Sequence, residues 1–179
     1  MSKVDRRILK SQEAIKKAVV ELMSEKDFDD ITMQEIADRA NVNRKTIYLH
    51  YNDKYDLLNN LIEGHIKELR IICYPESSDE TQITWFEYFE RNYCFFSAFL
   101  SGKGAPYFRS RFLEFVIEDF RNGWELVEGR RNGLNEDIML NFFASAYVGL
   151  VEWWFAKGMP YPSSVMNKQA ESILDMNLS

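Results

Sequence analysis

Residues 32–51 read TMQEIADRANVNRKTIYLHY, and this stretch decides the fold of the first third of the chain. Thr32 and Glu35 have the spacing of a capping box, in which the threonine hydroxyl accepts a free backbone N–H of the helix and the glutamate carboxylate accepts the N–H of the cap. Apolar residues then recur at helical spacing, at Met33, Ile36, Ala37 and Ala40. The pattern predicts a short helix with one buried face.

A tight turn and a second short helix follow. Asn41 tolerates the left-handed backbone that such a turn requires, and Asn43 can cap the next helix. Ile47 can face inward, which leaves Arg44 and Lys45 outward. In a helix-turn-helix, the first residues of the second helix contact base edges in the major groove. The stretch therefore favours DNA binding over the alternative, an ordinary helical hairpin with a solvated polar face.

At these residues the chain resembles the TetR family of bacterial transcription regulators, from Arg6 to Leu61. The family pattern is a long amphipathic helix, a turn with a phenylalanine, a threonine that opens the second helix, and several short motifs at fixed spacing. The matching elements here are Ile15 to Met23, Phe28, Thr32, Ile36-Ala37, Ala40 to Asn43, Arg44 to Thr46, Tyr48 to Tyr51 and Lys54 to Leu57. The resemblance implies an all-α fold of about nine helices. The implied fold has an N-terminal three-helix DNA-binding head with a helix-turn-helix and a C-terminal helical body for ligand binding and dimerisation.

Matched position by position, the resemblance implies base contacts from Asn43, Arg44 and Lys45. It also implies phosphate contacts from five residues: Thr32, Thr46, Tyr48, His50 and Lys54. The chain departs from the family pattern at two positions, because Asn41 and Lys45 stand where glycine is common. Lys45 adds a long cationic side chain at the DNA surface, so the operator preference of relatives does not transfer to this chain.

The chain divides into three parts. We expect a helix-turn-helix DNA-binding domain at residues 1–52, a linker helix at 53–72, and a regulatory and dimerisation domain at 73–179. The boundary segment 74–79 holds a proline followed by small and acidic residues. The sequence shows no β alternation of any length and no internal repeat. Hydrophobic residues make up 46% of the chain, which supports a well-filled core.

The charge of the chain is unevenly divided. The net charge of −6 is unusual for a DNA-binding protein, but residues 1–70 hold 13 basic and 13 acidic side chains. The remaining residues hold 9 basic and 15 acidic side chains, so all of the net acidity lies there. A neutral head can still present one basic face, and Lys3 to Lys10 could follow the DNA backbone or a minor groove. The alternative for that segment is a solvated, frayed N-terminus.

Several features argue against catalysis, a metal or a membrane. The cysteines Cys73 and Cys94 lack Cys-x-x-Cys spacing, so we expect core residues in a reducing cytoplasm and no metal. The histidines His50 and His65 form no catalytic set, and there is no glycine-rich phosphate loop, so no enzyme activity and no cofactor are expected. No apolar run approaches the ~20 residues that span a bilayer, and there is no signal region. We therefore expect a soluble, cytoplasmic protein with no membrane partner.

Aromatic residues crowd the second part of the chain. One interpretation is a pocket for a small apolar or aromatic effector, lined by Trp85, Phe89, Tyr93, Phe112, Phe115, Phe120 and Trp124. The alternative is that these rings fill the core, which aromatic residues at helical spacing usually do. The body could also respond to a protein partner in place of a small molecule.

The segment from Phe142 to Trp154 is apolar on more than one helix face, so it must be buried on both sides. One side can meet the core and the other a second subunit, and Ala146 and Gly149 allow a close helix approach. The resemblance implies dimerisation through the last two long helices, and the expected interface residues are Phe143, Tyr147, Leu150, Trp154 and Ile173. Residues 149–162 are also similar to the C-terminal ends of a subgroup of these regulators from Gram-positive bacteria.

These features predict a transcription regulator that acts as a homodimeric repressor. It is expected to bind a palindromic operator in double-stranded DNA. One recognition helix reads few bases, whereas a twofold dimer reads two half-sites about 34 Å apart or a multiple of that. A small-molecule effector in the body is expected to control DNA affinity. The alternative is a regulator or co-activator of the same fold whose body binds a protein partner. The sequence leaves the operator, the effector and the sign of regulation open.

Overall fold

The computed structural model describes residues 3–73, 83–100, 105–124 and 135–178 of the chain. Within these ranges all regular structure is helical, which confirms the predicted all-α fold class. The helices are α1 (Lys3–Glu25), α2 (Met33–Ala40), α3 (Arg44–Tyr48), α4 (Lys54–Cys73), α5 (Trp85–Arg91), α6 (Tyr93–Leu100), α7 (Ala105–Trp124), α8 (Glu136–Ala156) and α9 (Ser163–Leu178). A 3₁₀ turn, η1 (Phe28–Asp30), precedes α2.

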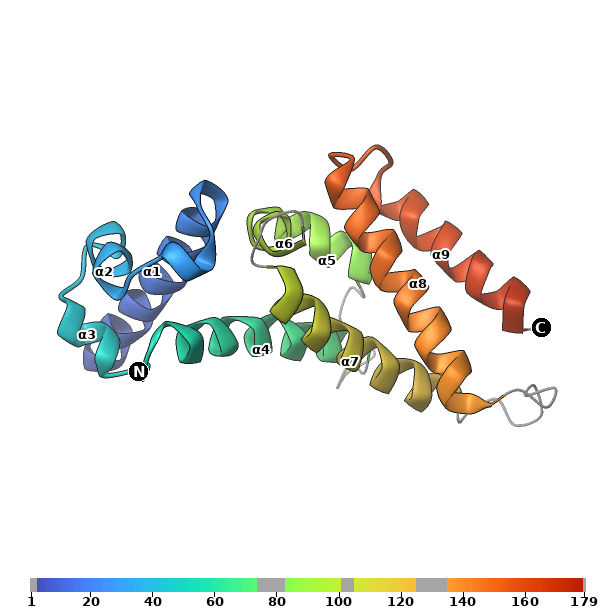
Figure 1. The fold of residues 1–179 in the computed structure, drawn as a ribbon, viewed down its shortest axis with the longest axis horizontal. Helices are drawn as coiled ribbons and strands as arrows, with labels where there is room; N and C mark the ends of the chain where they lie inside the picture. Colours follow the sequence, from blue (N-terminus) through green and yellow to red (C-terminus); the bar gives the residue numbers. More distant parts are fainter. Residues whose placement is uncertain (1–2, 74–82, 101–104, 125–134, 179) are drawn as a thin grey trace.

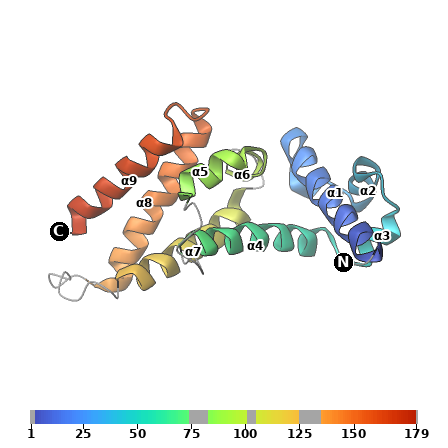
Figure 2. The same ribbon diagram turned by 180° about the vertical axis from the view of Figure 1, so that it is seen from behind.

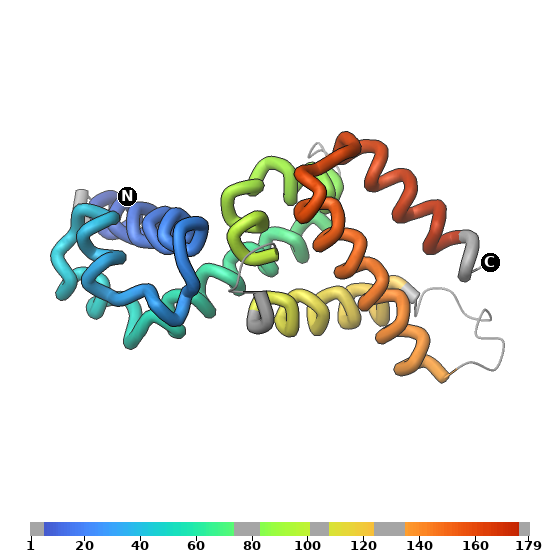
Figure 3. Tube along the Cα trace, turned by 45° about the horizontal axis from the view of Figure 1, so that its top comes forward, coloured from blue at the N-terminus to red at the C-terminus, as the bar shows by residue number. Residues whose placement is uncertain are grey.

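The helices form a head and a body joined by one long helix (Figure 1). The head consists of α1, α2 and α3, and α4 runs from the head into the body; Figure 2 shows the same order from behind. In the body, α8 and α9 diverge from the turn that connects them, as Figures 1 and 3 both show. The head meets the body at a second place besides α4, because α1 packs against α6.

Local signals fix the helix boundaries in the head. Thr32 Oγ1 accepts the backbone N–H of Glu35 at 3.2 Å, and the Glu35 carboxylate accepts the N–H of Thr32 at 2.9 Å, so the predicted capping box is present. Asn41 ends α2 with a φ of 52° and a ψ of 47°, the left-handed backbone expected there. The N–H of Val42 then donates to the carbonyl of Ala37 at 3.0 Å. These bonds close the turn between α2 and α3.

The body core is built from aromatic rings that contact one another. The centroid of Phe89 lies 4.8 Å from that of Phe96 and 5.8 Å from that of Phe112, and Phe108 lies 5.6 Å from Phe112. The largest fully buried side chains of the body are Phe86, Phe89, Phe96, Phe99, Phe108, Phe112 and Trp154. Each such ring contributes roughly 1.5–3 kcal/mol by removal of apolar surface from water. This cluster is therefore a main source of the stability of the body.

The structure shows where the residues expected at a dimer interface lie in one protomer. Four of the five expected residues lie on the core side of the helix: Phe143, Tyr147, Leu150 and Trp154. Trp154 is fully buried, and its Nε1 donates to the carbonyl of Tyr161 at 2.8 Å. Tyr147 packs edge-on against Trp85, with ring centroids 5.5 Å apart. The fifth residue, Ile173 on α9, is 49% exposed.

Among the described residues, α8 is the one helix long and apolar enough to cross a bilayer by length and composition. This differs from the expectation that no apolar run approaches that length. The helix nevertheless packs six side chains into the body core: Leu140, Ala144, Val148, Val151, Trp154 and Phe155. The packing of the protomer accounts for the apolar residues on this side of the helix, whereas Ile138, Phe142 and Trp153 remain exposed.

The two cysteines lie in different environments, and only one fits the expected core position. Cys73 is half-buried, and its Sγ accepts the indole N–H of Trp85 at 3.1 Å. Burial raises the pKa of the Cys73 thiol. Cys94 is exposed, which corrects the expectation of a buried residue. In the described ranges no group of three or more His, Cys, Asp or Glu side chains could hold a metal ion.

A buried hydroxyl in the head gives a stability prediction. Tyr51 is 3% exposed, and its hydroxyl has no hydrogen-bond partner among the described residues. Burial raises the pKa of this hydroxyl. A buried polar group without a partner costs about 1–3 kcal/mol. We expect Tyr51→Phe to raise the free energy of unfolding by about 1 kcal/mol, measured by urea denaturation. Tyr55→Phe is the matched control, because the Tyr55 hydroxyl donates to Asp29 at 3.1 Å; an equal gain in both variants would contradict the assignment.

Candidate DNA-binding site

The short helix α3 is anchored on one side and exposed on the other. Ile47 is fully buried, whereas Arg44 and Lys45 are exposed. Asn43 caps the helix, because its Oδ1 accepts the backbone N–H of Lys45 at 2.9 Å. The cap fixes where α3 begins, and therefore which side chains stand at its N-terminal end.

Arg44 is held along the outer side of α3 by Tyr48. Its Nη2 donates to the Tyr48 hydroxyl at 3.0 Å, and the guanidinium carbon lies 5.4 Å from the ring centroid. The Tyr48 residue is itself 46% exposed, so the pair faces solvent. An arginine that is already ordered loses less conformational entropy when it binds a ligand. The pair thus holds Arg44 in an ordered position on the exposed side of α3.

Three of the predicted phosphate-contacting residues lie in α3 or directly after it. Thr46 is half-buried on α3, and Tyr48 is exposed. His50 is half-buried, and its ring stands edge-on to Tyr51 with centroids 6.2 Å apart. The structure therefore groups these three with the base-contacting candidates Asn43, Arg44 and Lys45.

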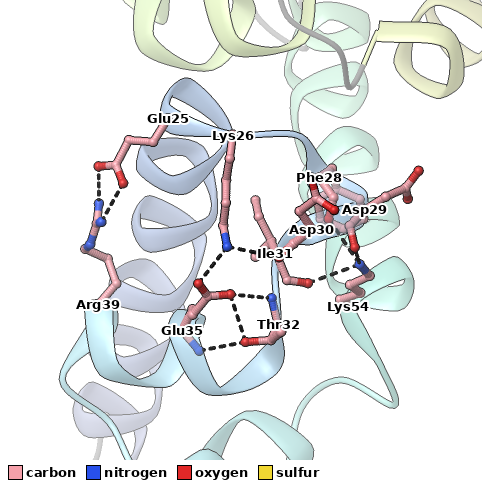
Figure 4. Close-up of polar contacts among 10 residues, drawn as sticks. All are labelled: Glu25, Lys26, Phe28, Asp29, Asp30, Ile31, Thr32, Glu35, Arg39 and Lys54. Carbon is pink, nitrogen blue, oxygen red and sulfur yellow. Dashed lines mark hydrogen bonds and ion pairs between the residues drawn. The ribbon is translucent and has the colours of Figure 1, made fainter.

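Thr32 is engaged within the head and offers no free donor. Its hydroxyl donates to Glu35 Oε2 at 2.9 Å and accepts the N–H of Glu35, while its backbone N–H bonds the same carboxylate. These bonds and the Lys26 ammonium, which donates to Glu35 Oε1 at 2.6 Å, lower the pKa of Glu35 to about 2. Figure 4 shows this arrangement. Thr32 is thus the cap of α2, and its expected role as a phosphate contact stays a prediction.

The Lys54 ammonium is also hydrogen-bonded within the head, and its expected contact with phosphate stays a prediction. Its ammonium donates to three backbone carbonyls of the turn before α2, those of Phe28 at 3.1 Å, Asp29 at 2.6 Å and Ile31 at 3.0 Å (Figure 4). An ammonium group has three protons, so these bonds use all of them. Lys54 therefore ties the start of α4 to the η1 turn.

This role of Lys54 can be tested by stability. Lys54→Met keeps the aliphatic stem and removes the ammonium, which leaves three carbonyls without their donor. We expect the free energy of unfolding to fall by about 1–3 kcal/mol in urea denaturation. Lys67→Met, at an exposed position of α4, should change it little. An unchanged stability in Lys54→Met would show that the ammonium is free to contact DNA.

Two further features of the head were not singled out by the sequence. Leu49, directly after α3, is 79% exposed, an unusual exposure for a leucine beside a polar helix. The predicted basic arm is the start of a helix, since α1 begins at Lys3. Its side chains Arg6, Arg7 and Lys10 are exposed, and the first turns of α1 lie at the same end of the head as α3 (Figure 1).

The residues proposed for an effector pocket are mostly parts of the core. The buried members are Trp85, Phe89, Phe112, Phe115 and Phe120. Their rings contact one another or neighbouring rings, as Trp85 does with Phe115 at 5.2 Å between centroids. These rings therefore fill the core, which is the alternative to a pocket that the helical spacing of the aromatic residues favoured. Tyr93 differs, because it is 43% exposed, and the side chain of Trp124 lies outside the described residues.

Comparisons with known proteins identify the family. Residues 15–61 match the model described as bacterial regulatory proteins, tetR family. Residues 76–176, more than half of the chain, match the model described as transcriptional regulator C-terminal region. The chain belongs to the TetR family. The resemblance read from the sequence is confirmed, and with it the DNA-binding helix-turn-helix and a role in transcription regulation.

One curated relative of this TetR-family protein is an uncharacterized HTH-type transcriptional regulator, YxbF, from Bacillus subtilis (strain 168). The two sequences are 36% identical over 67 residues, which is 37% of this chain and 18% of the relative. The likeness therefore concerns a small part of that longer protein, and its activity as a whole does not transfer.

Solved structures share the fold over nearly the whole TetR-family chain. A TetR transcriptional regulator from Streptococcus agalactiae 2603V has a TM-score of 0.70 and 27% identity, covering 94% of this chain and 96% of that one. The fatty acid degradation regulator FadR from Bacillus halodurans has a TM-score of 0.67 and 17% identity, covering 91% and 93%. The second likeness concerns the fold alone. Family and fold are those of transcription regulators, which are generally not enzymes.

Proposed function

We propose that this TetR-family protein is a repressor that binds a palindromic operator in double-stranded DNA as a homodimer. The observation that supports this best is the start of α3. Two exposed cations, Arg44 and Lys45, lead a helix whose other side is anchored by the buried Ile47. In a helix-turn-helix, side chains at this position reach base edges in the major groove.

Three residues at the start of α3, and Leu49 directly after its end, each have their own chemistry for a base. Arg44 and Lys45 donate to O6 and N7 of guanine. Asn43 uses one lone pair of Oδ1 for the cap of α3 and keeps its NH₂ group for N7 of adenine. Leu49 offers an apolar contact to the methyl group of thymine. These four residues form the proposed reading surface.

Phosphate contacts position the head without reading sequence. The proposed set combines the three candidates next to α3 with the exposed cations on the first turns of α1: Thr46, Tyr48, His50, Arg6, Arg7 and Lys10. Thr32 and Lys54 leave the set because their hydrogen bonds are made within the head. The start of α1 and helix α3 lie at one end of the head (Figure 1), so their exposed cations can give a charge-neutral head a basic surface there.

The dimer forms through the outer α8 face, which we define as Ile138, Phe142, Ser145, Ala146, Gly149 and Trp153. These residues recur every three or four positions, so they lie along one side of the helix. Ile138 is 72% exposed and Phe142 is 67% exposed, and a continuous apolar strip of this kind marks an interaction site. The small residues between them let a second helix approach closely. On α9, Val165 and Ile173 are also exposed apolar residues.

In this proposal each of the three parts of the chain has its own function. Residues 1–52 bind DNA, residues 53–72 connect head and body, and residues 73–179 dimerise and receive a small-molecule signal. The signal changes the tilt or separation of the two heads, so that the recognition helices no longer fit successive grooves. The protein acts in the cytoplasm, in contact with DNA.

Two ion pairs join the linker helix to the body. Arg70 Nη2 on α4 lies 2.5 Å from Glu118 Oε2 on α7, and Arg111 on α7 bonds Glu63 on α4. Partly exposed pairs such as these contribute at most about 1 kcal/mol each to stability. Their position matters more for regulation than their energy, because they join α4 to α7. A shift of α7 therefore moves α4, and α4 moves the head.

Selection from a random pool of double-stranded DNA tests the proposal. We expect an enriched inverted repeat, bound with an affinity that falls steeply as salt rises, because cation–phosphate contacts release counterions. In a reporter with the selected sequence at the promoter, expression of the protein should lower transcription. A pool without an enriched sequence contradicts operator binding, and a rise in transcription contradicts repression.

A further inference from the structure

A groove lies where the head meets the body, away from α3. It has a volume of about 590 Å³ and is lined by residues of α1 and α6, two helices that contact each other. One wall belongs to the head and is made by Lys16, Lys17, Val20 and Glu21 of α1. The other walls come from α4, α5 and α6 of the body and its linker. Pockets of about 300–1,000 Å³ are the size that holds small ligands.

Four aromatic side chains line the body side of the groove, those of His65, Tyr88, Tyr93 and Phe95. His65 of α4 stacks on Phe95 with ring centroids 3.7 Å apart, and its Nδ1 is hydrogen-bonded to the Tyr88 hydroxyl at 2.8 Å. Burial and the charge of Lys16 lower the pKa of His65 to about 4, so the imidazole is neutral at pH 7. Tyr93 lines the same groove and is 43% exposed. Flat apolar surfaces of this kind suit an aromatic ring.

The charged lining favours an anion. Lys17 and Glu21 are 3.7 Å apart and offset each other. Lys16 and Arg91 form no ion pair within the described part of the chain, and they face one remaining carboxylate of the lining, that of Glu68. The charges left after pairing sum to one positive charge. A molecule with a single carboxylate complements this balance.

We propose that the groove binds a small aromatic carboxylate, with its ring against Phe95 and Tyr93 and its carboxylate paired with Lys16 and Arg91. The proposal rests on the proposed function in one respect, because it takes this molecule to be the signal that controls operator binding. It also moves the ligand site from the aromatic core, where Phe89 packs against Phe112, to the junction of head and body.

A ligand in this groove touches the DNA-binding head directly. The same helix, α1, forms one wall of the groove and packs against α2 and α3. A molecule held between α1 and α6 fixes the angle of the head against the body, and operator affinity falls when that angle does not fit DNA. The coupling is reciprocal, so operator DNA should weaken binding of the carboxylate by the same factor.

Titration of the DNA-free protein tests the site. We expect 2-naphthoate to bind with a Kd of about 100 μM or tighter, and the neutral 2-naphthalenemethanol to bind about tenfold more weakly. Lys16→Gln combined with Arg91→Gln should remove the preference for the acid. Absence of naphthoate binding at about 1 mM, or equal binding of acid and alcohol, overturns the proposal.

Gly64 supplies a variant that fills the groove. A Cβ atom added at Gly64, which lines the groove, meets no atom within 4 Å, so a side chain can begin there without a clash, and we expect the leucine of Gly64→Leu to occupy ligand space. We expect it to weaken naphthoate binding by about tenfold or more. Gly123→Leu on α7 is the matched control, because it is equally unhindered and lies outside the groove. Equal naphthoate affinity in Gly64→Leu and Gly123→Leu overturns the assignment.

The exposed Cys94 gives an independent readout in the unmodified chain. It lines the groove, whereas Cys73 is half-buried with a raised thiol pKa and should react slowly. Naphthoate should slow alkylation of Cys94 by iodoacetamide, and an unchanged rate contradicts the site. Both measurements use protein without DNA, so they remain informative if operator binding fails. Naphthoate that binds here and leaves operator affinity unchanged refutes the regulatory role and leaves the DNA-binding function standing.

Discussion

Arg44→Ala combined with Lys45→Ala is expected to abolish specific operator binding and leave the fold intact. Both side chains are exposed at the start of α3, so their removal leaves no cavity. A good contact between a cationic side chain and a base is worth about 1–3 kcal/mol. Two such losses weaken binding by about 30-fold to 10,000-fold. Fluorescence anisotropy on the selected DNA measures the change.

The control for this variant must separate base reading from bulk charge. Lys67→Glu changes the net charge by the same two units at an exposed position of α4. We expect it to shift affinity for all DNA slightly and to leave sequence preference unchanged. If the double variant still preferred the selected sequence over random DNA, α3 would not be the reading helix.

Ile138→Glu combined with Phe142→Glu is expected to convert the dimer into a folded monomer. Both residues are more than half exposed in one protomer, so glutamate is tolerated there by the isolated chain. In the dimer the change removes two apolar contacts of roughly 1.5–3 kcal/mol each and places charges against each other. We expect the dimer dissociation constant to rise by more than about 100-fold, measured by analytical ultracentrifugation.

Loss of the dimer should also lower operator affinity, because one head then holds only one half-site. Ile71→Glu is the matched control, an exposed isoleucine on α4 away from the outer α8 face. It should leave both the dimer and operator binding unchanged. A double variant that remains dimeric would place the interface elsewhere on the body.

The features predicted well from the sequence depend on neighbouring residues. The capping box of Thr32, the left-handed turn at Asn41 and the cap at Asn43 all act within a few residues, and each is present in the structure. The helical pattern of the whole chain is also local, and the all-α fold class was predicted for that reason.

The features missed depend on contacts between distant residues. Lys54 bonds carbonyls more than twenty positions earlier in the chain, and no local pattern shows that its ammonium is occupied. The sequence could not show which face of α8 meets the core, because apolar residues lie on nearly every side of this helix. Their spacing therefore does not single out one buried face. Only the packing of Tyr147 and Trp154 distinguishes the core side from the outer side.

The groove between head and body could not be predicted from the sequence for a similar reason. Its walls come from Lys16 on α1, His65 on α4 and Tyr93 on α6, which lie far apart in the sequence. Tyr93 was placed in an effector pocket by its aromatic neighbours, and it does line a groove, but one that it shares with Tyr88 and Phe95 and with none of the other residues expected in that pocket. Aromatic content alone cannot separate a filled core from a lined groove.

A hydroxyl-radical footprint of the wild-type protein on the selected DNA tests the central claim most directly, namely that two α3 helices of a dimer read one operator. We expect two protected stretches related by a twofold axis, with centres about 34 Å apart or a multiple of that. A single protected stretch, or protection that does not depend on sequence, would contradict it.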